Sequence, residues 1–193
     1  MKAKKKDIRA LSREEIRDFF QNTGDKAFRG NQVYEWLWSK GAHHFDDMTN
    51  ISKETRELLS EHFVINHIEV DSIQKSKDGT IKNAVKLFDG LIVESVLIPT
   101  PSRTTACVST QVGCSLDCKF CATARLKKMR NLNPDEIYDQ VKAIDQESKL
   151  YHSRPLSNIV FMGMGEPLMN YNNVLKSIDK ITSEEGLGMS PKR

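Results

Sequence analysis

The four cysteines of this chain lie in one short stretch, between positions 107 and 121 of 193 residues. A disulfide framework in a small secreted domain would distribute its cysteines along the chain, where they join distant loops. The crowding therefore excludes a fold that depends on disulfides and favours a metal or redox site. Since no secretory signal pattern is visible either, we expect the chain to work in the reducing cytoplasm.

Length and composition are those of an ordinary globular chain. At roughly 100–200 residues per domain, the chain allows one full domain or two small ones. Its longest apolar stretch, residues 91–98, is interrupted by Glu94 and is too short to cross a membrane. The formal net charge of +3 creates no global field that would force nucleic-acid binding. Length, composition and net charge therefore do not indicate a function, and only the sequence motifs do.

Residues 1–66 are predicted to form a helical domain. A capping-box pattern begins at Ser12, a second helix is expected over 31–40 with Gly41 as its C-cap, and a third begins near Ser52. The aromatic residues of the second helix allow two interpretations. They could be a platform on which RNA bases stack, or the core of a three-helix unit, which we favour. These aromatic residues are Tyr34, Trp36 and Trp38.

Residues 67–104 are predicted to form an antiparallel β meander and a connector. Strands are expected near 67–73, 81–88 and 91–98, separated by Asp-Gly turn signals. A segment rich in proline then follows the third strand.

Residues 105–193 follow the pattern strand, helix, strand, helix. A strand is expected over 106–112, and a continuously apolar one over 158–162, as is typical of a parallel sheet covered on both faces. Asn133 and Pro134 mark the start of the first helix. The fold class is therefore α/β: a small helical domain and a short antiparallel β element, followed by the first βα units of a barrel or doubly wound sheet.

Three of the cysteines, Cys114, Cys118 and Cys121, have the spacing C-x3-C-x2-C. Three thiolates on one loop can hold a compact metal centre. A structural zinc site and a ferredoxin-type cluster each use four protein ligands, so three leave one iron of a cubane open to another ligand. Cys107 could supply a fourth thiolate, but a whole predicted strand separates it from the others.

This motif resembles that of the radical S-adenosylmethionine (SAM) superfamily. There, three cysteines hold a [4Fe-4S] cluster whose open iron binds SAM, which implies that the same three cysteines are cluster ligands here. The segment 163–167 is similar to the superfamily's SAM-amino-binding segment, which implies Gly165 and Glu166 as SAM-binding residues. The chemistry agrees, because glycine permits close backbone approach and a carboxylate can accept from an ammonium group. The resemblance also implies a partial radical SAM barrel and an external electron donor such as flavodoxin.

Longer blocks narrow the resemblance. Phe28–Leu37, Val93–Pro99, Cys107–Cys114 and Phe161–Leu168 are similar to segments of the dual-specificity RNA methyltransferases, which methylate adenine C2 in 23S ribosomal RNA and in tRNA. In that family one SAM methylates a cysteine near the C-terminus, and a second SAM provides a radical that activates this methyl group. A disulfide then resolves the crosslinked enzyme–RNA intermediate.

The resemblance gives roles to two further residues. Cys107 matches the family cysteine that forms the transient disulfide, and Glu94 matches the family's proton acceptor. Considered alone, Glu94 is a carboxylate inside an apolar strand, and it either faces outward at an edge or is functional.

One departure from the family is large, because no cysteine follows Cys121. We therefore expect the chain to be an N-terminal portion that lacks the C-terminal part of the enzyme. Alone, it should not transfer methyl groups, and its partial barrel should leave an unpaired strand edge that is prone to association.

Two alternatives remain open. A related family methylates adenine C8 of ribosomal RNA and confers antibiotic resistance. The cysteine loop could instead be a zinc or electron-transfer module beside RNA-binding helices, without radical chemistry. The basic stretch 119–130 could line an RNA path or be a solvated surface.

Overall fold

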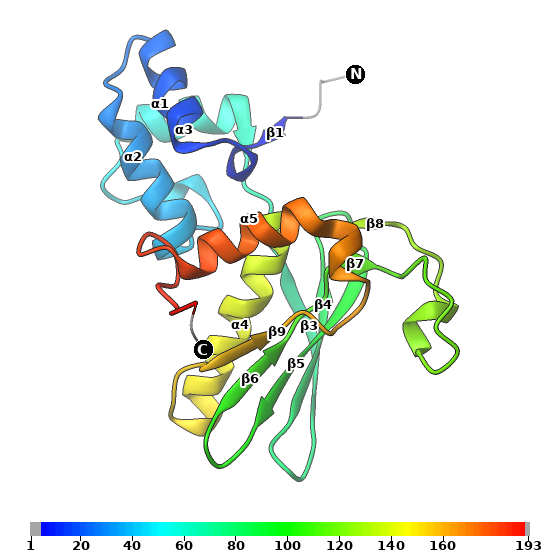
Figure 1. The fold of residues 1–193 in the computed structure, drawn as a ribbon. Coiled ribbons are helices and arrows are strands. Elements are labelled where there is room, and N and C mark those ends of the chain that lie inside the picture. The colour runs from blue at the N-terminus through cyan, green and yellow to red at the C-terminus, as the bar shows by residue number, and fades with distance from the viewer. Residues whose placement is uncertain (1–4, 192–193) are drawn as a thin grey trace. The chain divides into compact units, whose positions relative to one another are not determined.

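The computed structural model describes residues 5–191. Residues 1–4 of the predicted helical domain and 192–193 of the predicted barrel portion lie outside the described residues. The chain divides into two compact units, both visible in Figure 1. The first contains the residues up to Asn66 together with Glu184–Leu187, and the second contains the remainder. Within the described range, no helix is both long enough and apolar enough to span a bilayer.

The first unit is helical, as predicted. The Ser12 capping box is confirmed, because its hydroxyl accepts from the Glu15 backbone N–H at 3.1 Å and the Glu15 carboxylate accepts from the Ser12 N–H at 2.6 Å. The second helix begins at Phe28 instead of residue 31, and its last turn is π-helical and ends at Gly41 with φ 72°. The described elements are β1 (Lys6–Asp7), η1 (Ile8–Ala10), α1 (Arg13–Asn22), α2 (Phe28–Glu35), η2 (Trp36–Lys40), η3 (Phe45–Asp47), α3 (Lys53–His62) and β2 (Phe63–Val64).

The aromatic residues of the second helix serve mainly the core of this unit. Tyr34 and Trp38 are buried, whereas Trp36 is half-buried and donates from its indole N–H to the Asn50 side chain at 2.5 Å. This arrangement agrees with the core interpretation for Tyr34 and Trp38.

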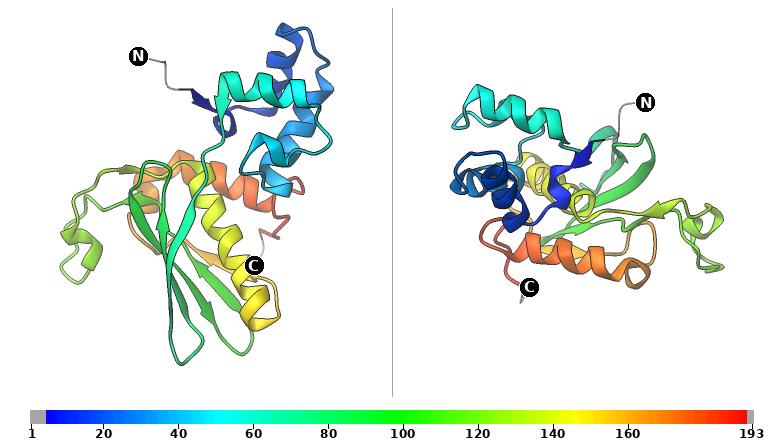
Figure 2. Two further views of the ribbon diagram at one scale, coloured as in Figure 1. Left: turned by 180° about the vertical axis from the view of Figure 1, so that it is seen from behind. Right: turned by 90° about the horizontal axis from the view of Figure 1, so that it is seen from above.

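The second unit contains a five-stranded sheet, seen from two further sides in Figure 2. Its strand order is β3-β4-β5-β6-β9. Its first three pairings are antiparallel, which confirms the predicted meander, and β9 joins β6 in parallel. Since β5 pairs with β6, the meander and the first barrel strand belong to one sheet. The elements are β3 (Glu69–Lys75), β4 (Ile81–Lys86), β5 (Ile92–Pro99), β6 (Thr104–Cys107), β7 (Gln111–Val112), η4 (Ala122–Arg125), β8 (Arg130–Asn131), α4 (Pro134–His152), β9 (Asn158–Val160), η5 (Pro167–Asn170) and α5 (Tyr171–Thr182).

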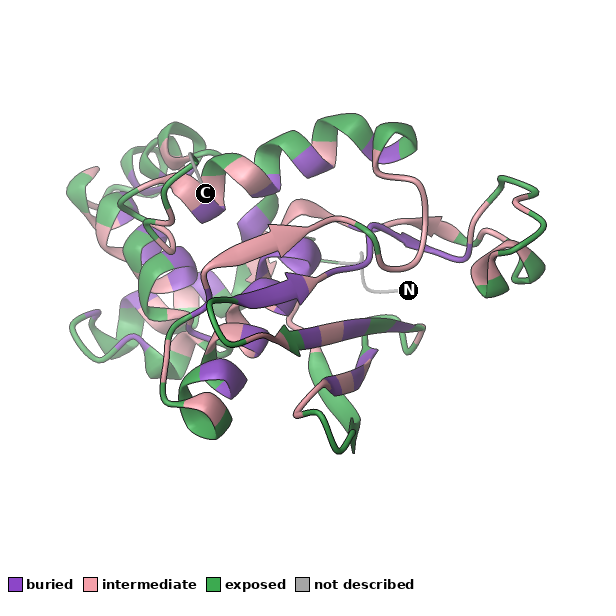
Figure 3. Cartoon of the chain, turned by 60° about the horizontal axis from the view of Figure 1, so that its bottom comes forward, coloured by how far each residue is buried: buried purple, intermediate pink, exposed green. Residues whose placement is uncertain are grey.

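The core of this unit lies between the sheet and α4. Strand alternation directs one set of apolar side chains toward this helix, and the opposite face of β5 carries exposed ones. The expectation that the apolar strand near 158–162 is covered on both faces is wrong. β9 is the outermost strand of the described sheet, and each of its residues is only half-buried (Figure 3). The buried apolar residues of this core include Val85, Val93, Leu97, Ala106, Ile137, Val141 and Ile144.

The strand predicted over 106–112 is divided into β6 and β7. The interruption has a local cause at Ser109, whose backbone N–H and C=O both bond to the buried side-chain amide of Gln140, at 2.9 and 3.1 Å. This amide replaces a neighbouring strand as the hydrogen-bond partner. The chain can therefore change direction between β6 and the cysteine loop.

Candidate functional site

The three cysteines of the C-x3-C-x2-C motif lie on the loop between β7 and β8, which extends away from the sheet (Figure 1). We call residues 114–129 the cysteine loop. At its base, Gly113 has φ 72°, and a Cβ there would lie 2.3 Å from the Lys127 carbonyl oxygen. The Met129 N–H also donates to the Val112 carbonyl at 2.8 Å. Glycine is thus required where the two ends of the loop approach each other.

The thiols of this loop are free and half-buried. The Leu116 backbone N–H lies 3.4 Å from the Cys114 sulfur, and hydrogen bonds from the Ala124 and Thr123 backbone lower the pKa of the Cys121 thiol. Among the described residues, no three His, Cys, Asp or Glu side chains converge closely enough to hold a metal ion. The donor set itself fits an iron–sulfur cluster, because three soft thiols share one loop and backbone N–H groups stabilise thiolates.

The predicted SAM-binding residues lie on the tight turn that follows β9. A Cβ at Gly163 would lie 2.7 Å from the Ser109 backbone nitrogen, and Gly165 has φ 96°. Glu166 caps the short helix η5, accepting from the Leu168 N–H at 3.1 Å. The glycines therefore allow this turn to lie directly on the segment that leads into the cysteine loop.

Cys107 and Glu94 lie on neighbouring strands and share one face of the sheet. Val96 on β5 pairs with Cys107 on β6, so strand alternation places Glu94 on the same face as Cys107. Burial raises the pKa of the Cys107 thiol, and a hydrogen bond from the Met162 backbone offsets only part of this increase. Glu94 is exposed and accepts from Lys82 at 3.0 Å. Glu94 thus faces outward, but from the central strand of the sheet and not from an edge, and its functional role stays a prediction.

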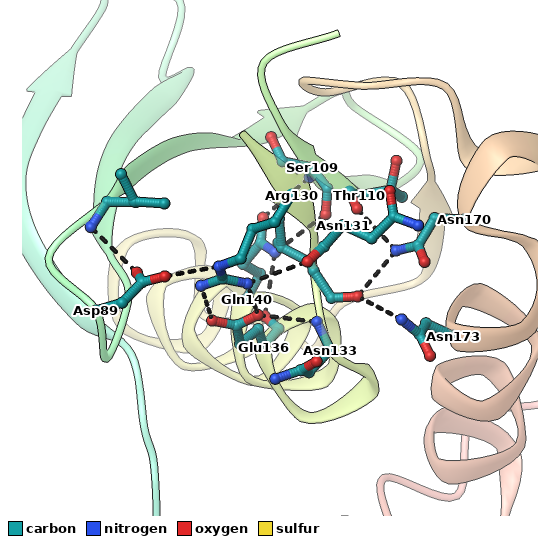
Figure 4. Close-up of polar contacts among 12 residues, drawn as sticks. Asp89, Ser109, Thr110, Arg130, Asn131, Asn133, Glu136, Gln140, Asn170 and Asn173 are labelled. Carbon is teal, nitrogen blue, oxygen red and sulfur yellow. Dashed lines mark hydrogen bonds and ion pairs between the residues drawn. The ribbon is translucent and has the colours of Figure 1, made fainter. Parts of the chain in front are cut away.

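A partly buried polar network at the base of the cysteine loop was not predicted from the sequence (Figure 4). Arg130 donates to both carboxylate oxygens of Glu136, at 2.7 and 2.8 Å, and to Asp89 at 2.6 Å. Burial by itself would lower the pKa of this guanidinium, but hydrogen bonds to Glu136 and Asp89 raise it above the ordinary value. Arg130 is therefore half-buried and engaged by two carboxylates, which corrects the solvated-surface interpretation of stretch 119–130 at this residue. The RNA-path interpretation of this stretch stays a prediction.

The same network includes amide side chains (Figure 4). The Asn170 side chain donates to the carbonyls of Thr110 and Leu132, at 2.8 and 2.9 Å. Asn173 donates to the same Leu132 carbonyl at 2.9 Å. The only sequence signal for this region was the helix start near Asn133, where the Glu136 carboxylate accepts from the Asn133 N–H.

Two family matches cover separate parts of the chain. Residues 6–65 match the family described as the ribosomal RNA large subunit methyltransferase N-terminal domain, and residues 108–190 match the radical SAM superfamily. A solved structure of a radical SAM methyltransferase from Sphaerobacter thermophilus is 33% identical, with a TM-score of 0.83. The alignment covers 97% of this chain and 55% of that one. The fold is thus similar to that of a radical SAM methyltransferase, and the cysteine loop lies within the part of the chain that matches the radical SAM superfamily.

Sequence relatives define the family more narrowly. Probable dual-specificity RNA methyltransferases RlmN from Flavobacterium johnsoniae and Flavobacterium psychrophilum are 76% and 78% identical over the whole chain. The chain spans 55% and 56% of the length of these two relatives. Over its whole length the chain is therefore similar to the N-terminal part of these dual-specificity RNA methyltransferases.

Proposed function

We propose that this chain carries the RNA-binding helical domain and the first part of the active site of a methyltransferase that acts on adenine C2 in 23S ribosomal RNA and in tRNA. One observation carries the proposal: a loop with three free thiols leads directly from the segment on which the Gly165–Glu166 turn rests. This arrangement suits a site in which a metal cluster and SAM are held side by side. We also propose that the protein works in the cytoplasm with an external electron donor such as flavodoxin.

In this proposal, Cys114, Cys118 and Cys121 hold a [4Fe-4S] cluster. When bound, the cluster would supply the electron for the reductive cleavage of the SAM sulfonium. Glu166 accepts hydrogen bonds from the SAM ammonium group, and Gly165 leaves room for the ligand to approach the backbone. Each of these residues thus binds or orients the ligand.

The open face of the sheet supplies the remaining groups. Burial keeps Cys107 as a thiol. In the last step its thiolate would attack the sulfur of the family's methyl-carrying cysteine, so that the S–S bond forms as the bond from that sulfur to the RNA-linked carbon breaks and its electron pair passes to the RNA. Glu94 accepts a proton from the substrate, and its exposed position leaves it accessible to RNA. The two residues lie on adjacent strands, so they can act on the same bound nucleotide.

Anaerobic reconstitution with iron and sulfide tests the proposal. We expect a brown protein with about four irons per chain, whose spectrum changes when SAM is added. Stoichiometric zinc without iron would instead support a zinc module. The regiochemistry is tested by mass spectrometry of rRNA and tRNA nucleosides from cells that express the full gene. We expect 2-methyladenosine, and 8-methyladenosine would contradict the proposed C2 chemistry.

A further inference from the structure

We propose that Gln111 and Asn131 are positioning residues, whose side-chain amides hold the Gly165–Glu166 turn at a fixed place relative to the cysteine loop. We call this pair the amide bridge. The inference rests on the proposed function, since it concerns the same cluster and SAM site. It adds to that function the residues that set the spacing between the two ligand-binding segments.

Gln111 contacts both segments at once. It is fully buried on β7, three positions before Cys114. Its Oε1 accepts from the Glu166 backbone N–H at 3.0 Å, and its Nε2 donates to Asn131 Oδ1 at 2.8 Å. The two ends of one amide are therefore used by two segments that lie far apart in the sequence.

Asn131 continues the bridge from the other end of the cysteine loop. It lies on β8, where it pairs with Gln111 in the two-stranded ladder. Its Nδ2 donates to the Met169 carbonyl of η5 at 3.3 Å. Both ends of the loop base are thus bonded to the turn and to the short helix after it.

The glycine of the turn makes this contact possible. A Cβ at Gly165 would lie 2.5 Å from the Gln111 Cβ, and the φ of 96° is itself unfavourable for other residues. The turn therefore rests directly on the Gln111 side chain. An apolar side chain could fill the same volume, but it would leave the half-buried Glu166 N–H and Asn131 Oδ1 without these partners.

The bridge also determines the direction of the Glu166 carboxylate. The backbone nitrogen of Glu166 is held by Gln111, and its carboxylate is held by the Leu168 N–H. A ligand bound to both the cysteine loop and Glu166 requires a constant distance between them, and partners behind the direct ligands commonly set such distances. Loss of the bridge should therefore weaken SAM binding more than cluster assembly.

Gln111→Met tests this, because it removes both amide groups and keeps a similar side-chain length. The reconstituted variant should retain the wild-type iron and sulfide content but bind SAM roughly 10-fold more weakly, as measured by titration of the SAM-induced spectral change. In the cofactor-free chain, the Glu166 amide proton should exchange faster with solvent. Unchanged SAM affinity would overturn the proposal.

Asn173→Leu is the matched control, because Asn173 also donates a side-chain N–H to a backbone carbonyl of this region but bonds to neither Gln111 nor Glu166. It should bind SAM as the wild type does, and an equal weakening would show that general destabilisation is the cause. If Q111M does not fold, N131A provides the same test, with a smaller loss of SAM affinity expected. Failure of the proposed function is distinguishable, since wild-type protein would then show no SAM response at all.

Discussion

The cysteine loop and its base are adjacent in sequence but are held in opposite ways. The loop is exposed, and the Phe120 side chain on it is 94% accessible to solvent. At the base, Gln111, Leu132 and Glu136 are buried and hydrogen-bonded. Packing and hydrogen bonds therefore fix the base, whereas the loop makes few side-chain contacts with the rest of the fold.

This difference indicates how the site is organised. A rigid base presents three thiols on a segment that gains few interactions from the rest of the fold. Binding of a metal cluster would then supply the missing constraints, since metal binding and the ordering of a site are coupled. Variants of the loop should accordingly change metal content, and variants of the base should change folding stability.

The largest effect is expected for Cys118→Ala. Loss of one of three ligands should reduce the iron bound after anaerobic reconstitution to background, while the unfolding temperature of the metal-free chain stays nearly unchanged, because Cys118 is only half-buried. Iron content is measured colorimetrically. Cys107→Ser is the control and should retain wild-type iron. If C118A keeps its iron or C107S loses it, the ligand assignment is wrong.

Arg130→Met, a variant of the loop base, should lower folding stability, in contrast to the loop variant Cys118→Ala. It leaves the buried Glu136 carboxylate without its bidentate partner, which should reduce the free energy of unfolding by about 3 kcal/mol. Urea denaturation of the metal-free chain measures this change. Lys119→Met removes the same charge from an exposed ion pair with Asp117 on the loop, and should cost less than about 1 kcal/mol. Equal losses for the two variants would remove the distinction between loop and base.

Gly113→Ala tests the close approach of the two ends of the loop. The new methyl group would overlap the Lys127 backbone carbonyl, in addition to the strain of a positive φ. Gly90→Ala is matched in φ, at 81°, but meets nothing within 4 Å. We therefore expect G113A to lose about 2 kcal/mol more unfolding free energy than G90A. A difference near zero would mean that the base relaxes easily and is not rigid.

The sequence predicted the elements better than it predicted their connections. Local signals at Ser12, Gly41 and the Asp-Gly turns led to correct helices and strands, because capping and turn chemistry are local. The division of the strand over 106–112 depends on the Gln140 amide, which lies 31 residues after Ser109, on α4. Such long-range polar contacts have no periodic pattern, so they are visible only in the folded structure.

The difference between local motifs and long-range contacts also explains which site residues the sequence pointed to and which it did not. The cysteine spacing and the glycine turn are compact motifs, so the sequence and the resemblance that it carries could point to the cysteine loop and Glu166, whose roles stay predictions. Arg130 was grouped with a basic stretch, because nothing local shows that its partners are Asp89 and Glu136. Gln111 was not identified for the same reason, since its contacts are with Asn131 and Glu166.

The smallest effect concerns a second buried carboxylate on α4, which contrasts with the one at the loop base. Glu136 has a cation as its partner, whereas the Glu147 carboxylate accepts from the Asn83 amide at 2.8 Å. Burial raises the pKa of Glu147, an effect that Asn83 and Lys75 only partly oppose. Because the folded chain binds this proton more tightly than the unfolded chain, ionisation reduces stability as the pH rises from the unfolded value of 4.5 through the folded one.

Glu147→Gln keeps an acceptor for Asn83 and removes this titration. Its stability relative to the wild type should therefore be similar at pH 4 and higher at pH 7.5, as measured by urea denaturation at both values. Glu136→Gln should instead destabilise the chain at pH 7.5, because it removes the negative charge beside Arg130. If both variants changed stability in the same direction at pH 7.5, the ion pair would not be what distinguishes the loop base from the rest of the helix.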